Sequence, residues 1–284
     1  MDLKSSKHLV EAQNRASIFL DENGLDGTLA RQYWLMLFDW TLTEYVQQLQ
    51  KPVAIDLLEQ YEVALKRLVK HEPIQYIVGY ADFMNERFKV TPDTLIPRED
   101  TAGLIELAMN FLQNNPTSRV LDIGTGTGII PIKLAKTFPT ADISACDLSE
   151  AALKVAIENA ESHNVEIYFV KSDLFNQLDS ETPFDVIISN PPYISENELS
   201  LMDESVKKFE PTLALFAEDE GLAIYQRIAL EAHNYLNPNG LILLEIGFQQ
   251  GEAVKAIFQS EYPDAEILIE KDLNSLDRYV KIQL

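Results

Sequence analysis

The sequence predicts a two-part protein, with a small all-α region followed by an α/β region built on a mostly parallel sheet. Residues 1–73 show only helical patterning, and residues 74–92 fit a β-hairpin that links the two parts. From residue 93 onward, short apolar strands alternate with helical stretches. This alternation is typical of a mostly parallel sheet with helices on both faces. We therefore expect domains at 1–73 and 93–284, joined by the hairpin linker at 74–92.

The first region is expected to form a bundle of four or five short helices. Apolar residues recur at helical spacing in two segments, at Leu29, Tyr33, Trp34, Leu37 and Phe38, and at Ile55, Leu58, Tyr61, Leu65 and Leu68. Glycine and proline interrupt these segments at Gly24, Gly27, Pro52 and Pro73. The aromatic residues fit the core of such a bundle, so only the position of this region suggests partner recognition.

The expected strands and helices of the second region follow one another in order. Residues 76–79 and 87–90 are β-prone, and 81–86 can turn between them, which predicts the hairpin. Further strands are expected at 120–123, 143–146, 166–170, 184–189, 241–246, 267–269 and 278–282. Helices are expected after the loop at 124–128 and at 151–162, 222–235 and 251–258. Ligands of such sheets bind beyond the carboxyl ends of the strands.

Charge and composition narrow the possible partners. Asp and Glu number 45 against 23 Lys and Arg, which gives a net charge of −22, and no basic run stands out. Proteins that grip nucleic acid usually present a basic face, so duplex DNA or a large RNA is disfavoured as substrate. The single cysteine, the polar first residues and the lack of a long apolar run predict a cytoplasmic protein without a membrane span. We expect a monomer without a metal site.

The first motif that points to a ligand is the loop after the expected strand at 120–123. It consists of Gly124, Thr125, Gly126, Thr127 and Gly128. Glycines at a strand-to-helix turn tolerate positive φ and let a ligand approach the backbone. Position 129 is isoleucine, so the Gly-x-Gly-x-x-Gly dinucleotide fingerprint does not match. Gly-x-Gly-x-Gly after an acid-tipped strand resembles instead the first motif of class I S-adenosylmethionine-dependent methyltransferases.

Two further loops extend this candidate cofactor site. Asp147 ends the second expected strand, where a carboxylate can accept both hydroxyls of a ribose, and Ser149 is better placed to cap the next helix. The loop after the third strand, Ser172-Asp173-Leu174-Phe175, is of the kind that flanks adenine in class I methyltransferases. There Asp173 would accept from the adenine amino group and Leu174 would pack on the ring. A plain β-to-α turn stays open as the alternative for this loop.

The motif that decides the class of reaction is Asn190-Pro191-Pro192-Tyr193, directly after the strand at 184–189. Residues before a proline favour extended backbone and proline fixes its own φ, so this loop is expected to be rigid. An amide or aromatic amino nitrogen is a poor nucleophile because its lone pair is delocalised. The Asn190 side-chain oxygen and the Pro191 carbonyl can each accept one N–H of such a group. They would aim the nitrogen and favour the positive charge that develops on it.

Two details of this motif complete the chemistry. Tyr193 can stack on a flat target group. Asn190 cannot serve as a general base, so methyl transfer is expected to come first and proton loss afterwards.

The surrounding residues resemble one methyltransferase family. The four-residue motif alone also occurs in adenine-amino DNA methyltransferases and guanine-amino RNA methyltransferases. The neighbouring matches are residues 72–79; Phe83, Phe88 and Val90; residues 95–98; Glu210-Pro211 with Ala214-Leu215; residues 244–247 with Gln250-Gly251; and residues 271–273 with Asp277-Arg278. Over roughly residues 72–280, this combination resembles the protein-glutamine methyltransferases that act on peptide-chain release factors (the PrmC/HemK family).

This resemblance implies a fold, a reaction and a set of site residues. It implies a five-helix amino-terminal domain that helps dock the release factor, a β-hairpin linker and a Rossmann-like catalytic domain with a seven-stranded sheet. The substrate would be the glutamine of the Gly-Gly-Gln loop of class I release factors, methylated on its amide nitrogen by S-adenosyl-L-methionine. By motif matching, the cofactor would be lined by Gly124, Thr125, Gly126, Thr127, Gly128, Asp147, Asp173, Leu174 and Asn190. The glutamine would be held by Asn190, Pro191, Pro192 and Tyr193.

The chain also departs from the family pattern. The family often has Pro-Glu-Thr-Glu after Ile-Pro-Arg, whereas this chain has Glu99-Asp100-Thr101-Ala102. A glycine common near the carboxyl end is replaced by Ser275. The first departure puts in doubt a specific role for acids in that loop, and neither touches the glycine loop or the catalytic motif.

Two other functions stay open at this point. An amino-nitrogen methyltransferase acting on adenine or guanine in nucleic acid is disfavoured by the acidic balance and by the lack of a recognisable base-reading module. A cofactor-binding scaffold without activity is disfavoured by the intact Asn190 and Tyr193.

Overall fold

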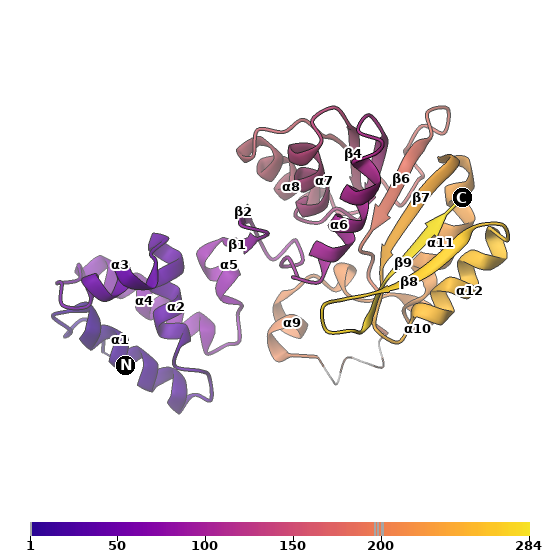
Figure 1. Cartoon of the computed structure of the whole chain (residues 1–284). Coiled ribbons are helices and arrows are strands. Elements are labelled where there is room, and N and C mark those ends of the chain that lie inside the picture. The colour runs from indigo at the N-terminus through magenta and orange to yellow at the C-terminus, as the bar shows by residue number, and fades with distance from the viewer. Residues whose placement is uncertain (1, 196, 198, 200–201) are drawn as a thin grey trace. The chain divides into compact units, whose positions relative to one another are not determined.

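The computed structural model describes residues 2–195, 197, 199 and 202–284 (Figure 1). The chain divides into two compact units. The helical unit comprises Met1–Gly79 with Asp203–Phe209, and the sheet unit comprises Tyr80–Met202 with Glu210–Leu284. Among the described residues, no helix has the length and apolar character needed to cross a membrane.

The helical unit is a small bundle with an aromatic core. Its helices are α1 (Leu9–Glu22), α2 (Leu29–Phe38), α3 (Leu42–Gln48), α4 (Ile55–Leu68), α5 (Ile74–Val78) and α9 (Glu204–Phe209). Trp34 and Tyr61 are fully buried with ring centroids 4.7 Å apart, and the Tyr61 hydroxyl donates to the Ala30 carbonyl at 2.7 Å. The core position expected for the aromatic residues is confirmed for Tyr33, Trp34 and Tyr61, whereas Phe38 at the end of α2 is exposed.

The β-hairpin begins later in the chain than the sequence predicts. Residues 76–79 are not a strand, because α5 occupies Ile74–Val78 and ends at Gly79, whose φ of 88° suits a helix carboxyl cap. The strands are β1 (Tyr80–Phe83) and β2 (Glu86–Lys89), which pair antiparallel. Met84 and Asn85 between them both have positive φ (47° and 63°), as a two-residue turn of this hand requires. The β-propensity of residues 76–78 is thus overridden by the local helix boundary.

The sheet unit contains a seven-stranded, mostly parallel sheet, as expected. Its strands are β3 (Arg119–Ile123), β4 (Asp142–Asp147), β5 (Tyr168–Lys171), β6 (Phe184–Ser189), β7 (Leu236–Glu245), β8 (Glu266–Lys271) and β9 (Asp277–Gln283). They lie in the order β5-β4-β3-β6-β7-β9-β8. The first five of this order are parallel, and β9 runs antiparallel to both its neighbours.

Helices cover both faces of this sheet (Figure 1). One face carries α6 (Thr101–Leu112), α7 (Ile129–Thr137) and α8 (Glu150–Ser162), and the other carries α11 (Ala223–Glu231) and α12 (Gly251–Glu261). Short helical turns complete the unit at η2 (Thr212–Ala214), α10 (Glu218–Gly221) and η3 (Ala232–Asn234). Successive strand residues serve opposite cores, because Val120 packs with α6 and α7 whereas Leu121 packs with α11 and α12. Helix α6 was not among the helices predicted from the sequence.

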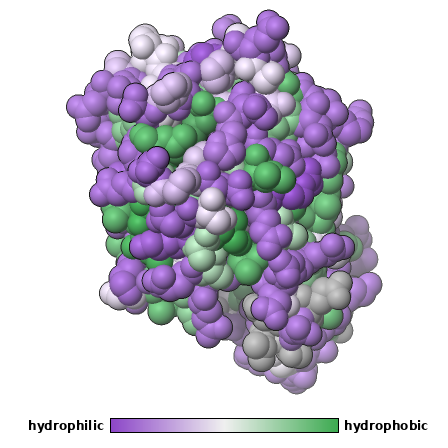
Figure 2. Space-filling model, turned by 90° about the vertical axis from the view of Figure 1, so that its right-hand side faces the viewer, coloured by the Kyte–Doolittle hydropathy of each residue, from purple (hydrophilic) through white to green (hydrophobic). Residues whose placement is uncertain are grey.

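The molecular face seen in Figure 2 is largely polar. Hydrophilic residues cover most of it, and hydrophobic residues show as small separate groups. Scattered groups of this kind are ordinary on protein surfaces and do not by themselves mark a docking site.

Candidate active site

Four parallel strands end at one edge of the sheet and bring the predicted motifs together. In the sheet register, Ile123 at the end of β3 pairs with Cys146 of β4 and with Ser189 of β6. Asp147 at the end of β4 pairs with Lys171 of β5. The segments that follow these strands are therefore neighbours along the edge, in the order 172–174, 147, 124–128 and 190–193.

The glycine loop leaves open space next to its backbone. Gly124, Gly126 and Gly128 have φ of 74°, 54° and 81°, a region that favours glycine. A Cβ at Gly124 or Gly126 would meet no atom within 4 Å, whereas one at Gly128 would lie 3.1 Å from Cδ1 of Ile132. The first two glycines thus expose backbone to a potential ligand. The third lets Ala156 of α8 pack closely against the start of α7, because a Gly128 Cβ would lie 3.2 Å from the Ala156 Cβ.

Asp147 ties the glycine loop to the start of α8. Its Oδ2 accepts the Gly126 N–H at 2.9 Å and its Oδ1 accepts the Ser149 N–H at 2.8 Å. Burial raises the pKa of Asp147 above its ordinary value, and these backbone N–H groups partly oppose the rise. Ser149 caps α8 by accepting the Ala152 N–H at 3.2 Å, as expected. The strand end, the glycine loop and the helix start therefore form one hydrogen-bonded structure.

A buried carboxylate lies beneath the glycine loop. Asp122 in β3 has no exposed surface, and neither of its oxygens completes a hydrogen bond with any residue that the structure describes. Burial raises the pKa of Asp122 to about 7, and the charge of Asp147 adds to the rise. The Thr125 hydroxyl opposes this rise in the pKa of Asp122, but it too completes no hydrogen bond within the described chain. An uncompensated buried acid of this kind suits a positively charged ligand group.

The loop after β5 is rigid, and its acid already has a cationic partner. Leu174 is buried with a φ of 50°, and its carbonyl accepts the Ser172 hydroxyl at 2.7 Å. The Asp173 carboxylate contacts Nη1 of Arg227 at 2.8 Å through Oδ1. The alternative of a plain turn is therefore still open here, because Arg227 satisfies one oxygen of the acid that would meet adenine.

A hydrogen bond from the Gln250 side chain holds the backbone of the 190–193 loop in place. The Tyr193 carbonyl accepts the Gln250 side-chain N–H at 3.0 Å, and Gln250 in turn accepts the Gly247 N–H at 2.9 Å. A side chain at Gly221 would collide with the same Tyr193 carbonyl, so only glycine fits beside this loop. Burial raises the pKa of Tyr193 to about 12, which keeps the phenol neutral at physiological pH. A neutral ring suits stacking on a flat amide.

Relatives with known names resemble nearly the whole chain. One family model, the PrmC N-terminal domain, matches residues 11–79, and a second, the methyltransferase small domain, matches residues 102–214. A release factor glutamine methyltransferase of Enterococcus faecalis is 40% identical over 273 residues, which are 96% of this chain and 98% of that protein. Another, of Lactococcus lactis, is 41% identical over 251 residues, which are 88% of this chain and 92% of that protein. The chain belongs to the release factor glutamine methyltransferase family.

The fold of this chain is similar to that of a solved methyltransferase structure. The 16S rRNA N2 G1207 methyltransferase of T. Thermophilus, in complex with AdoMet and guanosine, superposes with a TM-score of 0.52 at 16% identity. The match covers 72% of this chain and 49% of that protein. At this identity the likeness concerns the fold alone, and it agrees with the class I methyltransferase fold expected for the sheet unit.

Three side chains at the site of this family member, Asp122, Thr101 and Glu245, were not among the predicted site residues. In the sequence, Asp122 stands out only as the acid near the end of its strand. Thr101 and Glu245 contact Asn190 directly or through one another, with the Asn190 Nδ2 donating to the Thr101 Oγ1 at 3.1 Å. Two signals in the sequence point to residue 245: a glutamate at the end of an apolar strand, and its place in the family match at residues 244–247.

Proposed function

We propose that this chain methylates the side-chain amide nitrogen of the glutamine in the Gly-Gly-Gln loop of class I peptide-chain release factors, with S-adenosyl-L-methionine as methyl donor. Membership in the family supports the reaction and the substrate. The structural observation that carries the proposal is the position of the 190–193 loop, which lies at the same sheet edge as the open glycine loop. A rigid pair of acceptors for an NH2 group thus adjoins a segment suited to a nucleoside-like ligand.

The residues around the glycine loop fit the methyl donor. Space at Gly124 and Gly126 leaves room for ligand atoms close to the backbone. Each Asp147 oxygen accepts one backbone N–H and has a further lone pair for a ribose hydroxyl. The Asp122 carboxylate, which has no hydrogen-bond partner among the residues that the structure describes, suits the positive charge that the donor carries. When bound, the donor supplies a methyl group made electrophilic by its positively charged sulfur.

The adenine side of the site involves the loop after β5. We propose that Leu174 packs against the adenine ring and that Asp173 accepts from its amino group. Arg227 occupies Oδ1 of Asp173, so the second oxygen would make this contact. Thr125 and Thr127 of the glycine loop complete the set of residues that would line the donor.

The target glutamine would be held by the 190–193 loop. The Asn190 Oδ1 and the Pro191 carbonyl each accept one amide N–H, while Pro192 keeps the backbone extended and Tyr193 stacks on the amide plane. The amide nitrogen forms the new bond to the methyl carbon with its lone pair, and the electron pair of the old bond stays on the donor sulfur. The nitrogen then loses its extra proton to water, because Asn190 cannot accept it.

The two regions would have different functions, docking of the release factor and catalysis. We propose that residues 1–73 dock the release factor, that residues 74–92 link the regions, and that residues 93–284 hold donor and glutamine. The match of residues 11–79 to the PrmC N-terminal domain supports the first assignment. The net charge of −22 supports a protein substrate over direct nucleic-acid binding. A monomer acting in the cytoplasm, where translation factors work, fits this function.

A partition experiment with radiolabelled methyl donor tests the substrate class. The chain is incubated with a class I release factor, with tRNA, with rRNA and with duplex DNA, and label is counted in each. We expect label in the release factor alone, and none when its loop glutamine is replaced by alanine. Label in a nucleic acid but not in the release factor would support the amino-nitrogen alternative. Donor binding without label in any substrate would support the inactive scaffold.

A further inference from the structure

The Asn190 amide is held by two buried side chains from other parts of the sheet unit. Its Nδ2 donates to Oγ1 of Thr101 at 3.1 Å, and the Thr101 hydroxyl donates to Oε2 of Glu245 at 2.8 Å. Thr101 is 2% exposed and Glu245 is 1% exposed, so water does not compete for these hydrogen bonds. We call these contacts the Asn190–Thr101–Glu245 relay.

The sheet register places the relay at the catalytic loop. Ser189 at the end of β6 pairs with Leu244 of the parallel strand β7, so the next residues, Asn190 and Glu245, are neighbours. Thr101 is the first residue of α6, and its hydroxyl lies between their side chains: it accepts from Asn190 and donates to Glu245. The three members therefore come from a loop, a strand end and a helix start.

The direction of the hydrogen bonds follows from the chemistry of the three groups. An ionised carboxylate can only accept, so the single hydroxyl hydrogen of Thr101 points to Glu245. The Thr101 oxygen then offers only lone pairs, and Asn190 must present its NH2 group to it. The Asn190 Oδ1 is left to face the other way. Without such partners the two ends of an amide are nearly alike in shape and can exchange places.

We propose that Thr101 and Glu245 are positioning residues, which keep the oxygen of the Asn190 amide turned toward the substrate nitrogen. The inference rests on the proposed function and adds two residues to it. With the amide reversed, Asn190 would present an NH2 group to the NH2 group of the glutamine. Donor would then face donor, and the nitrogen would lose one of the two acceptors that aim it.

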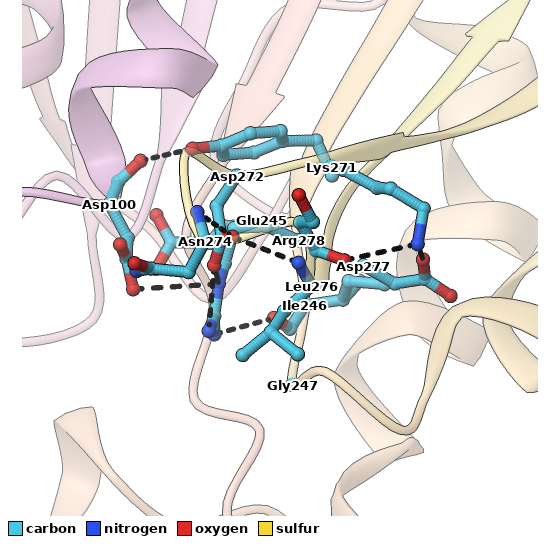
Figure 3. A network of polar contacts seen from close by, with 12 residues as sticks. Asp100, Glu245, Ile246, Gly247, Lys271, Asp272, Asn274, Leu276, Asp277 and Arg278 are labelled. Carbon is cyan, nitrogen blue, oxygen red and sulfur yellow. Dashed lines mark hydrogen bonds and ion pairs between the residues drawn. The ribbon is translucent and has the colours of Figure 1, made fainter.

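A second set of polar contacts fixes the backbone next to Thr101 and next to Glu245 (Figure 3). The Nε of Arg278 lies 3.5 Å from Oδ2 of Asp100, and its Nη1 donates to the Ile246 carbonyl at 3.2 Å. Asp100 directly precedes Thr101, and Ile246 directly follows Glu245. Arg278 therefore joins the segment that carries the hydroxyl to the segment that carries the carboxylate.

Tyr279 adds a further link to the start of α6. Its hydroxyl donates to the Asp100 carbonyl at 2.5 Å. A side chain at Gly103 would collide with the Tyr279 ring and hydroxyl, so glycine at this position allows the contact. Asp100, which stands where the family pattern has glutamate, thus has a structural role here through both its carbonyl and its carboxylate.

The charge on Glu245 sets the direction of the relay. Burial raises the pKa of Glu245 to about 7, and the hydrogen bond from Thr101, the charge of Arg278 and a hydrogen bond from the Asn190 side chain oppose this rise. The other titratable groups that act on Glu245 are Asp100, Tyr193, Tyr225 and Tyr279. A protonated Glu245 can donate to Thr101, whose hydroxyl would then point at Asn190 and draw the amide oxygen toward itself. Turnover is therefore expected to fall as pH drops through about 7.

Variants at position 101 test the relay through turnover. Thr101→Val keeps the shape and removes the hydroxyl, whereas Thr101→Ser keeps the hydroxyl. The matched control is Thr94→Val, because Thr94 is also buried and its hydroxyl donates to the nearby Thr91 carbonyl. At saturating donor and release factor, we expect Thr101→Val to lower kcat by about 10- to 100-fold, with little change in the donor Kd. Thr101→Ser and Thr94→Val should stay close to the wild-type kcat.

The pH profile and the amide resonances separate positioning from a merely structural role. Glu245→Gln should flatten the acid limb of the kcat profile that the wild type shows near pH 7. In ¹⁵N-labelled protein, the Asn190 side-chain NH2 resonances, identified by their loss in Asn190→Ala, should shift and exchange faster in Thr101→Val but not in Thr101→Ser. This second readout needs no substrate.

The outcomes distinguish this inference from the proposed function. Full turnover and unchanged Asn190 resonances in Thr101→Val would overturn the relay, while methylation by the wild type would leave the function intact. A wild type that transfers no methyl group to any release factor would contradict the function instead. The Asn190 resonances would then decide the orientation of the amide alone.

Discussion

Replacing Asp122 with asparagine tests whether a buried, ionisable carboxyl group at the sheet edge lowers the free energy of unfolding. Asp122 is fully buried, and burial raises its pKa from 3.8 to about 7. A difference of about 3 pH units, at roughly 1.4 kcal/mol per unit, corresponds to ~4 kcal/mol of stability. Asparagine has nearly the shape of the protonated acid and does not titrate.

The sign of the effect follows from proton binding. The folded protein binds the Asp122 proton more tightly than the unfolded chain does. The protonated side chain therefore contributes its full stability below about pH 4, and this contribution is lost as pH rises through about 7. Asp122→Asn should therefore raise the free energy of unfolding of the sheet unit at pH 8 by up to ~4 kcal/mol. The gain should shrink to ~2 kcal/mol at pH 5, where the wild-type side chain is mostly protonated when folded.

Urea unfolding monitored by far-ultraviolet circular dichroism measures this difference at the two pH values. Both tryptophans, Trp34 and Trp40, lie in the helical unit, so their fluorescence serves as an internal control that the substitution should not move. The stabilised variant should also bind S-adenosylmethionine more weakly, because it lacks the negative charge proposed to meet the donor. A variant that is no more stable than wild type at pH 8, or equally stabilised at both pH values, would refute the reasoning.

Three further substitutions test individual roles at the site. Asn190→Ala should lower turnover by ~10²-fold or more with a donor affinity within a few-fold of wild type, and near-normal turnover would contradict the acceptor role. Asp147→Ala should chiefly weaken donor binding, measured by isothermal titration calorimetry, and an unchanged dissociation constant would show that the ribose contact is misassigned. Gly221→Ala introduces a side chain that collides with the Tyr193 carbonyl, so kcat/KM for the release factor should fall while donor binding persists. An unaffected kcat/KM would show that the loop need not be rigid.

Much of the fold could be predicted because the central strands are buried on both faces. The apolar runs at 120–123 and 184–189 became β3 and β6 with almost the predicted bounds. The hairpin was misplaced, because β-propensity at residues 76–78 yielded to a helix bounded by Pro73 and Gly79. The signal for α6 was present in the spacing of Leu104, Ile105, Ala108 and Leu112, all of which face the core, but this segment was not assigned.

The candidate site divides into a part that sequence reveals and a part that it does not. The glycine loop, Asp147 and the 190–193 loop each follow a strand directly, and parallel strands bring such segments to one edge. Thr101 and Glu245 lie 144 residues apart, and their hydrogen bond depends on the packing of α6 and the register of β7. Nothing local in the sequence encodes that juxtaposition.

The central claim is that an amide nitrogen is methylated at the Asn190–Pro191–Pro192–Tyr193 loop. The most direct measurement is tandem mass spectrometry of a class I release factor after incubation with the enzyme and S-adenosylmethionine. We expect one added methyl group on the side-chain nitrogen of the Gly-Gly-Gln glutamine with the wild type, and a strong reduction with Asn190→Ala. An unmodified loop glutamine, or a methyl group on another residue of the release factor, would contradict it.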